Sequence, residues 1–284
     1  MAMDDMNPSL SSKIETVKKR LRELHSVVVA FSGGLDSTVL LKLAVDTLGP
    51  ARVLAVTGRS PSVPRADLEN VARLAAEAGA CHEFISTGEF ENPDYRANPP
   101  DRCYYCKSDL YVRLRRLAEE RGLRAVLCGT NADDLGDFRP GLRAADQFQV
   151  QAPLAEAGLS KAEVRQIARL LGLSVAEKPA SPCLSSRIPY GERVEPEKLR
   201  QIDAAESFLR DLGFGECRVR HHGSVARIEV PAEQIGRLAE PEMRSRVVGQ
   251  LRELGFQYVT LDLRGFRSGS LNEVLPIRPT VNGA

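Results

Sequence analysis

The string Ser32-Gly33-Gly34-Leu35-Asp36-Ser37 is the part of the sequence best suited to chemistry on a phosphate. It follows the unbroken apolar run 27–31, which predicts a strand buried on both faces, and it precedes a helical pattern. Two glycines let the backbone approach a ligand closely, and a helix N-terminus directs unpaired N–H groups and a positive dipole end toward it. We therefore predict an anion site formed by Ser32, Ser37 and backbone amides, with Asp36 holding Mg²⁺ against the phosphates.

The segment Gly129-Thr130-Asn131-Ala132-Asp133-Asp134 is a second candidate for the same site, because it follows an apolar run that ends at Cys128. In an open parallel sheet, ligands bind beyond the carboxyl ends of the strands. We therefore expect Gly129, Asn131 and Asp134 to complete the contacts to a nucleotide or to its Mg²⁺. A solvated acidic turn is the alternative for each of these residues.

Three cysteines lie in polar, proline-rich surroundings, namely Cys103, Cys106 and Cys183. The spacing of Cys103 and Cys106 lets two thiolates at a helix N-terminus share one metal centre, a position that lowers the pKa of a thiol. A redox dithiol is one alternative, and zinc is another, although zinc would need a second pair that the sequence lacks. Two cysteines from one loop and one from another match a [4Fe-4S] cluster whose fourth iron stays open. Cys183 is also a candidate nucleophile, because the nearby Lys178 and Arg187 would favour its thiolate form.

Composition and charge predict an ordinary cytoplasmic protein. Of the 284 residues, 43% are hydrophobic and 27% are charged, which is enough for a core in one larger and one smaller domain. The 39 Lys and Arg residues nearly cancel the 38 Asp and Glu residues, so the net charge of +1 gives no field that would attract nucleic acid or an anionic membrane. Residues 1–13 hold no apolar signal core, and no later run approaches the ~20 apolar residues of a spanning helix. The remaining cysteines lie in or beside short apolar stretches and are expected to be buried: Cys81, Cys128 and Cys217.

Strands and helices must alternate to position these residues, which predicts an α/β fold with a doubly wound parallel sheet. The expected strands cover 27–31, 53–56, 81–85 and 125–128, and the expected helices cover 14–24, 39–49, 65–78, 107–120 and 160–172. A smaller α+β domain is expected from a helix over 196–212, strands over 217–220, 225–230 and 258–263, and a helical region over 232–254. The predicted boundaries are a first domain over 1–177, a cysteine-bearing junction loop over 178–194, and a substrate-binding and oligomerisation domain over 195–284.

The string over residues 32–37 resembles the PP-loop of the ATP pyrophosphatase superfamily, whose members include GMP and NAD synthetases and tRNA thiolases. This resemblance implies that ATP is cleaved between its α and β phosphates and that AMP is transferred to a carboxylate or carbonyl oxygen. Nearly the whole chain resembles the LarE family of ATP-dependent pyridinium-3,5-biscarboxylic acid mononucleotide sulfurtransferases, which help to build the nickel-pincer cofactor of lactate racemase. The strings that carry this second resemblance are Pro100-Asp101 with Tyr104-Tyr105, Asp137-Phe138-Arg139-Pro140-Gly141, Ser185-Ser186-Arg187 with Pro189-Tyr190-Gly191, Arg218-Val219-Arg220, Ala226-Arg227-Ile228-Glu229, Tyr258-Val259-Thr260-Leu261-Asp262 and Gly265-Phe266-Arg267-Ser268-Gly269.

The family resemblance implies that a substrate carboxylate is adenylated, a cysteine sulfur attacks, AMP leaves, and C–S cleavage yields a thiocarboxylate. Some members sacrifice that cysteine, whereas others carry three cysteines and a [4Fe-4S] cluster that binds an extra sulfide. The positions of Cys103, Cys106 and Cys183 are similar to those of the second type. In the sacrificial pattern the cysteine follows Ala-Ser directly, whereas Pro182 lies between Ser181 and Cys183 here. Two roles therefore stay open for Cys183, that of the sulfur donor and that of a cluster ligand.

A phosphorylated, nucleotide-like dicarboxylate needs a second anion site. Arg218 and Arg220 alternate on a predicted strand and therefore face the same side, which suits a phosphate or a carboxylate. Glu206 and Glu229 match acidic positions of the family in the same region. Exposed charges on the smaller domain are the alternative for these four residues. Arg187 is assigned to the cofactor-binding residues.

The expected cofactors are ATP, Mg²⁺ and a [4Fe-4S] cluster, and the expected partners are further copies of the chain and a nickel-insertion protein of the same pathway. A tRNA thiolase is the first alternative, but it would need a basic, aromatic-bearing RNA surface that a net charge of +1 does not supply, although residues 218–222 are locally basic. A non-catalytic module that binds ATP or metal is the second alternative.

Overall fold

The computed structural model describes residues 8–136, 140–179, 181–267, 269–270 and 273. Asp137, Phe138, Arg139 and Ser268 of the family strings and Ala180 of the junction lie outside these ranges. The helices are α1 (Pro8–Leu24), α2 (Leu35–Leu48), α3 (Arg65–Glu77), α4 (Pro93–Arg96), α5 (Arg102–Glu120), α6 (Pro140–Gln147), α7 (Pro153–Glu156), α8 (Lys161–Leu170), α9 (Pro196–Asp211), α10 (Ile235–Ala239) and α11 (Pro241–Glu253). The strands are β1 (Val27–Ala30), β2 (Val53–Arg59), β3 (Cys81–Ser86), β4 (Ala125–Cys128), β5 (Arg218–His222), β6 (Val225–Glu229) and β7 (Tyr258–Leu261).

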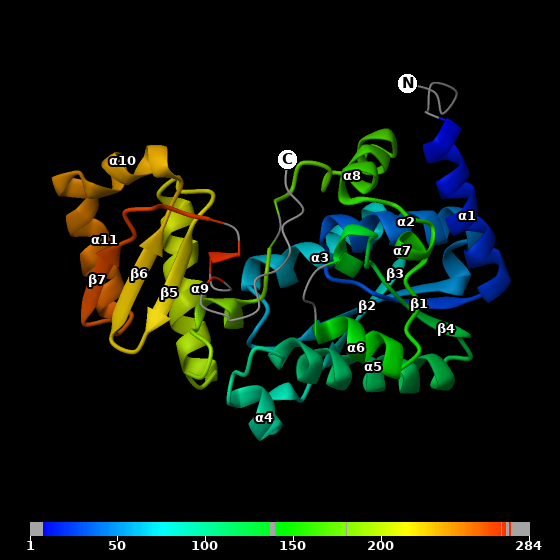
Figure 1. Ribbon diagram of the computed structural model, residues 1–284, viewed down its shortest axis with the longest axis horizontal. Coiled ribbons are helices and arrows are strands. Elements are labelled where there is room, and N and C mark those ends of the chain that lie inside the picture. The colour runs from blue at the N-terminus through cyan, green and yellow to red at the C-terminus, as the bar shows by residue number, and fades with distance from the viewer. Residues whose placement is uncertain (1–7, 137–139, 180, 268, 271–272, 274–284) are drawn as a thin grey trace.

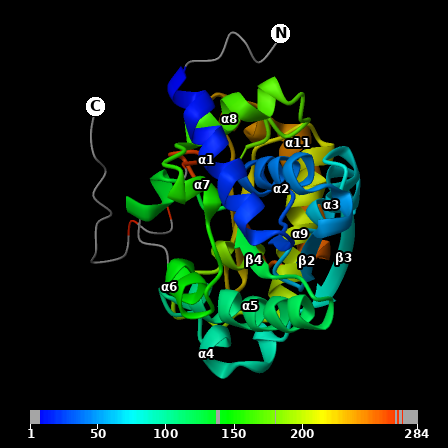
Figure 2. The ribbon, with the colours of Figure 1, turned by 90° about the vertical axis from the view of Figure 1, so that its right-hand side faces the viewer.

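The larger sheet is fully parallel, with the strand order β3-β2-β1-β4. Helices α1, α2, α3 and α8 lie on one side of it and α5 and α6 on the other (Figures 1 and 2). Successive side chains of a strand point to opposite faces, so Val27 and Val29 enter the core beneath α2 while Val28 enters the core beneath α5. The predicted doubly wound α/β fold is confirmed.

The smaller sheet has the order β5-β6-β7, in which β5 and β6 are antiparallel and β6 and β7 are parallel. Its core contains Leu209 of α9, Phe214, Val219 of β5 and Leu251 of α11. The crossover from β6 to β7 passes through α10 and α11, as a parallel pair requires. The smaller α+β unit is therefore also present.

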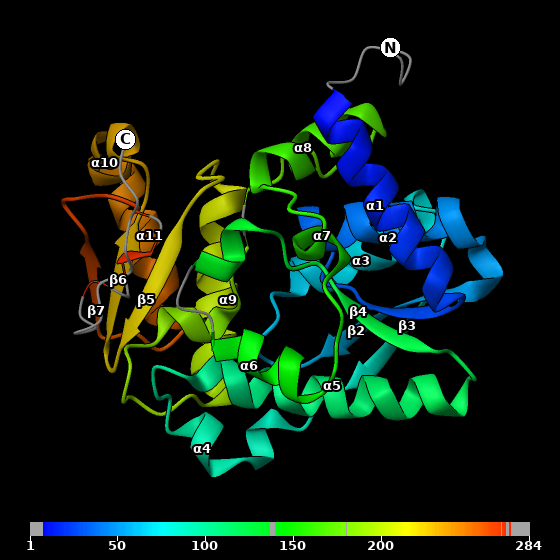
Figure 3. The same cartoon turned by 45° about the vertical axis from the view of Figure 1, so that its right-hand side comes forward.

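The junction segment, residues 181–194, runs from the larger to the smaller unit (Figure 3), and its Ser186 carbonyl oxygen accepts a hydrogen bond from Arg220 of β5. It contains a short 3-10 helix, η5 (Leu184–Arg187), whose first residue donates its N–H to the carbonyl oxygen of Ser62 at 2.8 Å. A separate apolar cluster joins α4, this segment and α9, and its buried members are Tyr95, Leu184, Ile188, Val194, Leu199 and Ile202. The segment thus forms a fixed connection, and the proposed boundaries at 177 and 194 remain predictions.

Several elements differ from their predicted extents: α1 begins at Pro8 instead of residue 14, α2 begins at Leu35 instead of residue 39, and β2 continues to Arg59 instead of ending at residue 56. Helix α5 begins at Arg102, five residues before the start predicted at Lys107, because the polar first turn lacks the apolar periodicity that marks the rest of the helix. The helical region 232–254 is divided, since Pro241 begins α11 at a position where proline's missing N–H costs nothing. In the part of the chain that the structure covers, no helix is both long and apolar enough to cross a membrane.

Candidate active site

The phosphate loop, residues 32–37, lies where β1 ends and α2 begins. Gly33 has a φ of 66°, and a side chain there would meet Val71 Cγ1 at 2.9 Å from its Cβ. The hydroxyls of Ser32 and Ser37 are 3.1 Å apart, and the Gly34 N–H donates to Ser32 Oγ at 3.3 Å. Because the N-cap residue is Gly34, no side chain caps the first-turn amides of α2, which suits them to an anion.

The segment 129–134 supports the phosphate loop from the neighbouring strand. A Cβ on Gly129 would lie 2.7 Å from the Ser37 nitrogen, so only glycine allows this approach. Asn131 Nδ2 donates to Asp36 Oδ1 at 3.1 Å, and the Asn131 N–H donates to Asp134 Oδ2 at 3.1 Å. Asn131 and Asp134 are 1% and 8% exposed, so the alternative of a solvated turn is wrong for both. Asn131 and Asp134 thereby orient Asp36.

Two lysines of the site were not predicted to contact it. Lys161, the first residue of α8, forms an ion pair with Asp36 Oδ2. Lys178 Nζ donates to the Gly33 carbonyl oxygen at 3.2 Å and to Asp67 Oδ1 at 3.0 Å. Lys161 is 125 residues from Asp36, and its sequence context indicates only a helix start. Asp36 is therefore paired with an ammonium group here, and its role as a magnesium ligand remains a prediction.

The thiols of Cys103 and Cys106 both have a raised pKa, and Cys183 contributes to both shifts. Cys103 and Cys106 lie in the first turn of α5, and Cys183 is the N-cap residue of η5. Desolvation and the Cys183 thiol raise the pKa of Cys103, whereas Arg102 and Lys107 oppose this rise. Desolvation and Glu89 likewise raise the pKa of Cys106, and Cys183 and Cys103 contribute.

The predicted lowering of the pKa of these two thiols by the helix N-terminus is wrong, because the desolvation of their sulfurs outweighs it. Within the described ranges, no group of three His, Cys, Asp or Glu side chains is arranged to bind a metal ion. Cys128 and Cys217 are buried as predicted. The prediction for Cys81 is wrong, because Cys81 is exposed as the first residue of the edge strand β3.

Arg187 is turned toward the smaller unit. Its guanidinium is 2% exposed and binds both carboxylate oxygens of Glu206, at 2.8 and 2.9 Å. Its Nη1 donates to the carbonyl oxygens of Pro182 and Cys183, at 2.7 and 3.1 Å. This arrangement favours a role in positioning the Cys183 segment over contact with a nucleotide, so the assignment of Arg187 to the cofactor remains an untested prediction.

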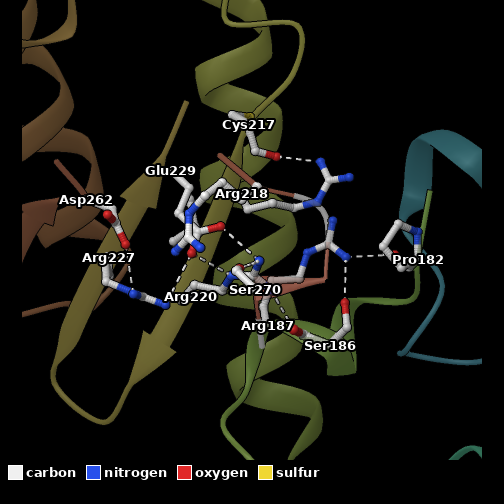
Figure 4. A network of polar contacts seen from close by, with 12 residues as sticks. Pro182, Ser186, Arg187, Cys217, Arg218, Arg220, Arg227, Glu229, Asp262 and Ser270 are labelled. Carbon is white, nitrogen blue, oxygen red and sulfur yellow. Dashed lines mark hydrogen bonds and ion pairs between the residues drawn. The ribbon is translucent and has the colours of Figure 1, made fainter. Parts of the chain in front are cut away.

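Beside the pair of Arg187 and Glu206 lies a second ionic cluster, which contains Arg218, Arg220 and Glu229 (Figure 4). Arg220 binds both oxygens of Glu229, at 3.0 and 2.8 Å, and donates to the Ser186 carbonyl oxygen at 2.8 Å. Arg220 is 5% exposed, and Glu206 and Glu229 are each 1% exposed, so the alternative of surface charges is wrong for these three. Arg218 lies 4.9 Å from the centre of the Phe266 ring. Burial, and after it the charge of Arg187, lowers the pKa of Arg218, while Glu206 opposes this shift.

A parallel sheet with an anion-binding loop between its first strand and the next helix is shared by several nucleotide-binding folds, and the string over residues 32–37 in this loop is that of the PP-loop class of ATP-cleaving enzymes. The NAD synthase family model matches residues 9–91 of this chain. A Synechocystis protein described as uncharacterised is 47% identical over 94% of this chain and 99% of its own length. Pyridinium-3,5-bisthiocarboxylic acid mononucleotide synthase of Lactiplantibacillus plantarum is 42% identical over 94% of this chain and 96% of its own length. The chain belongs to the LarE family of ATP-dependent sulfurtransferases.

Proposed function

We propose that this chain adenylates a carboxylate of pyridinium-3,5-biscarboxylic acid mononucleotide and converts it to a thiocarboxylate for nickel-pincer nucleotide biosynthesis. The Lactiplantibacillus plantarum relative is named for the bisthiocarboxylic product. One observation carries the proposal for the site. Lys178 Nζ donates to the Gly33 carbonyl oxygen of the phosphate loop, and Ser185, two residues after Cys183, accepts a hydrogen bond from Arg102, the neighbour of Cys103 on α5. One short segment therefore links the phosphate site to the sulfur site.

In the first half-reaction, the phosphate loop holds the triphosphate with the first-turn amides of α2 and the hydroxyls of Ser32 and Ser37. Lys161 and Lys178 supply positive charge at the same edge of the sheet. A substrate carboxylate oxygen attacks the α-phosphorus, and pyrophosphate leaves with the electrons of the bond that breaks. Fixed donors that face the developing charge lower the barrier to this step.

The second ionic cluster is the proposed site for the phosphate and the remaining carboxylate of the substrate. Arg218 and Arg220 supply the positive charge, while Glu206 and Glu229 fix the neighbouring guanidinium groups. Because Arg220 donates to the Ser186 carbonyl oxygen, a substrate held there lies beside the Cys183 segment.

The three cysteines fit a [4Fe-4S] cluster better than a single metal ion. Each cysteine of such a cluster binds a different iron, so the sulfurs need not converge on one point. Among the described residues no three ligand side chains surround a common position, and the cluster is proposed on the three-cysteine set alone. When bound, the cluster would supply the sulfur. The acyl carbon would gain one sulfide sulfur, supplied to the cluster from free sulfide, as its bond to the AMP oxygen breaks, which yields the thiocarboxylate and AMP.

The test is anaerobic purification followed by iron and sulfide assays, AMP and thiocarboxylate measurement, and intact mass before and after turnover. We expect iron, ATP-dependent product and an unchanged mass, with loss of product in Cys183→Ser and full activity in the matched control Cys81→Ser. A loss of sulfur from Cys183 during turnover would instead identify it as a sacrificial donor. No product with this substrate would overturn the proposal, and co-purifying RNA would favour a tRNA thiolase. Oligomerisation, a nickel-insertion partner and a cytoplasmic location remain predictions.

A further inference from the structure

Arg102 is a buried cation beside the sulfur site. It is the first residue of α5 and is 4% exposed. Its Nη1 donates to Asn98 Oδ1 and to the Ser185 carbonyl oxygen, the latter at 3.1 Å. Its guanidinium carbon lies 6.0 Å from the centre of the Tyr190 ring. All of these partners are neutral.

The surroundings of Arg102 hold sulfur where a carboxylate would be expected. Cys103 is the next residue on α5, and Cys183 lies two residues before Ser185, whose carbonyl oxygen accepts a hydrogen bond from Arg102 Nη1 at 3.1 Å. Buried charges are costly unless an opposite charge balances them. The neighbouring buried arginines obey this rule, since Arg187 pairs with Glu206 and Arg220 with Glu229. Arg102 has no such pair with any residue that the structure describes.

We propose that Arg102 is a positioning residue that supplies the counter-charge for an anionic sulfur group carried by Cys103 and Cys183. The inference rests on the proposed function, in which these cysteines carry the transferred sulfur. The same side chain also fixes the geometry. Its hydrogen bond to the Ser185 carbonyl ties the segment two residues after Cys183 to the turn that bears Cys103. Arg102 therefore serves both cysteines from one place.

The first test uses the full-length protein reconstituted anaerobically with iron and sulfide. We compare the wild type with Arg102→Gln, Arg102→Lys and the matched control Arg116→Gln, whose side chain is 81% exposed on the same helix. Loss of a nearby positive charge disfavours the more negative, reduced state. We expect a more negative midpoint potential and faster loss of iron in Arg102→Gln, rescue in Arg102→Lys, and no change in the control. Wild-type values in Arg102→Gln would overturn the proposal.

The second test needs no iron and separates this inference from the proposed function. Iodoacetamide reacts with the iron-free protein at a fixed pH, and mass spectrometry follows Cys103 and Cys183 against the exposed Cys81 as internal standard. We expect a several-fold slower reaction at the first two cysteines in Arg102→Gln and recovery in Arg102→Lys. If the wild type takes up no iron but this slowing occurs, the cluster is wrong and the role of Arg102 stands. Equal rates in all variants would refute that role, and circular dichroism confirms that each variant is folded.

Discussion

At the scale of single residues, the space around Gly129 determines the position of the phosphate loop. In Gly129→Ala, the new Cβ would lie 2.7 Å from the Ser37 nitrogen and 2.9 Å from the Asp36 carbonyl carbon, both backbone atoms. The loop must shift, so we expect ATP affinity to fall at least tenfold, with a loss of stability of about 1–3 kcal/mol. Calorimetric ATP titration and thermal unfolding measure these effects. The control is Gly136→Ala, because no atom of the described residues, apart from its own chain neighbours, lies within 4 Å of its added Cβ. Equal ATP affinity in the two variants would contradict this prediction.

The buried pair of Arg187 and Glu206 is the second residue-scale feature. Arg187→Met leaves Glu206 without its bidentate partner, and removing one member of a buried pair costs about 3–5 kcal/mol. We expect the lower end of that range, because Arg210 remains 3.6 Å from Glu206. Urea unfolding gives the value. Arg200→Met removes an exposed pair on α9 and should cost less than about 1 kcal/mol. A similar cost for both variants would show that burial of the pair is unimportant.

At the scale of elements, the start of α8 is joined to α1. Glu163 completes a capping box with Ser160 and accepts hydrogen bonds from Lys13 at 2.7 and 2.8 Å. The hydrogen bond from Lys13 is the largest cause that lowers the pKa of Glu163 below 4.5, its value in the unfolded chain. The carboxylate therefore stabilises the fold above that pH, and this contribution is lost as the pH falls through the lower, folded-state pKa.

We expect Glu163→Gln to reduce the free energy of unfolding at neutral pH and to flatten its decline below pH 4.5, because this linked proton is then absent. Urea unfolding at a series of pH values measures both effects. Glu197→Gln, on the exposed side of α9, serves as the control and should keep the wild-type profile. An unchanged acid limb in Glu163→Gln would show that this helix junction does not contribute to the pH dependence.

At the scale of the whole molecule, the apolar cluster around the Cys183 segment joins the two sheets. Ile188 is fully buried in this cluster, which contains side chains from α4 and from α9. We expect one calorimetric unfolding transition in the wild type. Ile188→Ala should lower stability by about 2–5 kcal/mol and divide the transition in two, because it weakens the contact between the units. Leu251→Ala removes a buried side chain of the smaller core without touching this cluster, and it should lower the temperature of the single transition without dividing it. A single transition in Ile188→Ala would contradict this coupling.

The sequence by itself determined the α/β class, the phosphate loop and most helix and strand positions, because apolar periodicity and glycine turns are local properties. It could also select the three cysteines, since their surroundings differ from those of Cys128 and Cys217. The early start of α5 could not be predicted, because its first turn mixes Arg102, which contacts the Cys183 segment, with Tyr104 and Tyr105, which pack on two different apolar clusters.

Only the tertiary structure decided which charged and polar groups meet. The pairs of Asp36 with Lys161 and of Arg102 with the Ser185 carbonyl join residues that are 125 and 83 positions apart. No local pattern specifies such contacts, because they depend on how elements pack after they have formed. The same reason explains the thiols of Cys103 and Cys106, whose pKa is raised where a helix N-terminus alone would lower it. Desolvation is a property of the assembled surroundings, and the sequence does not contain it in any single segment.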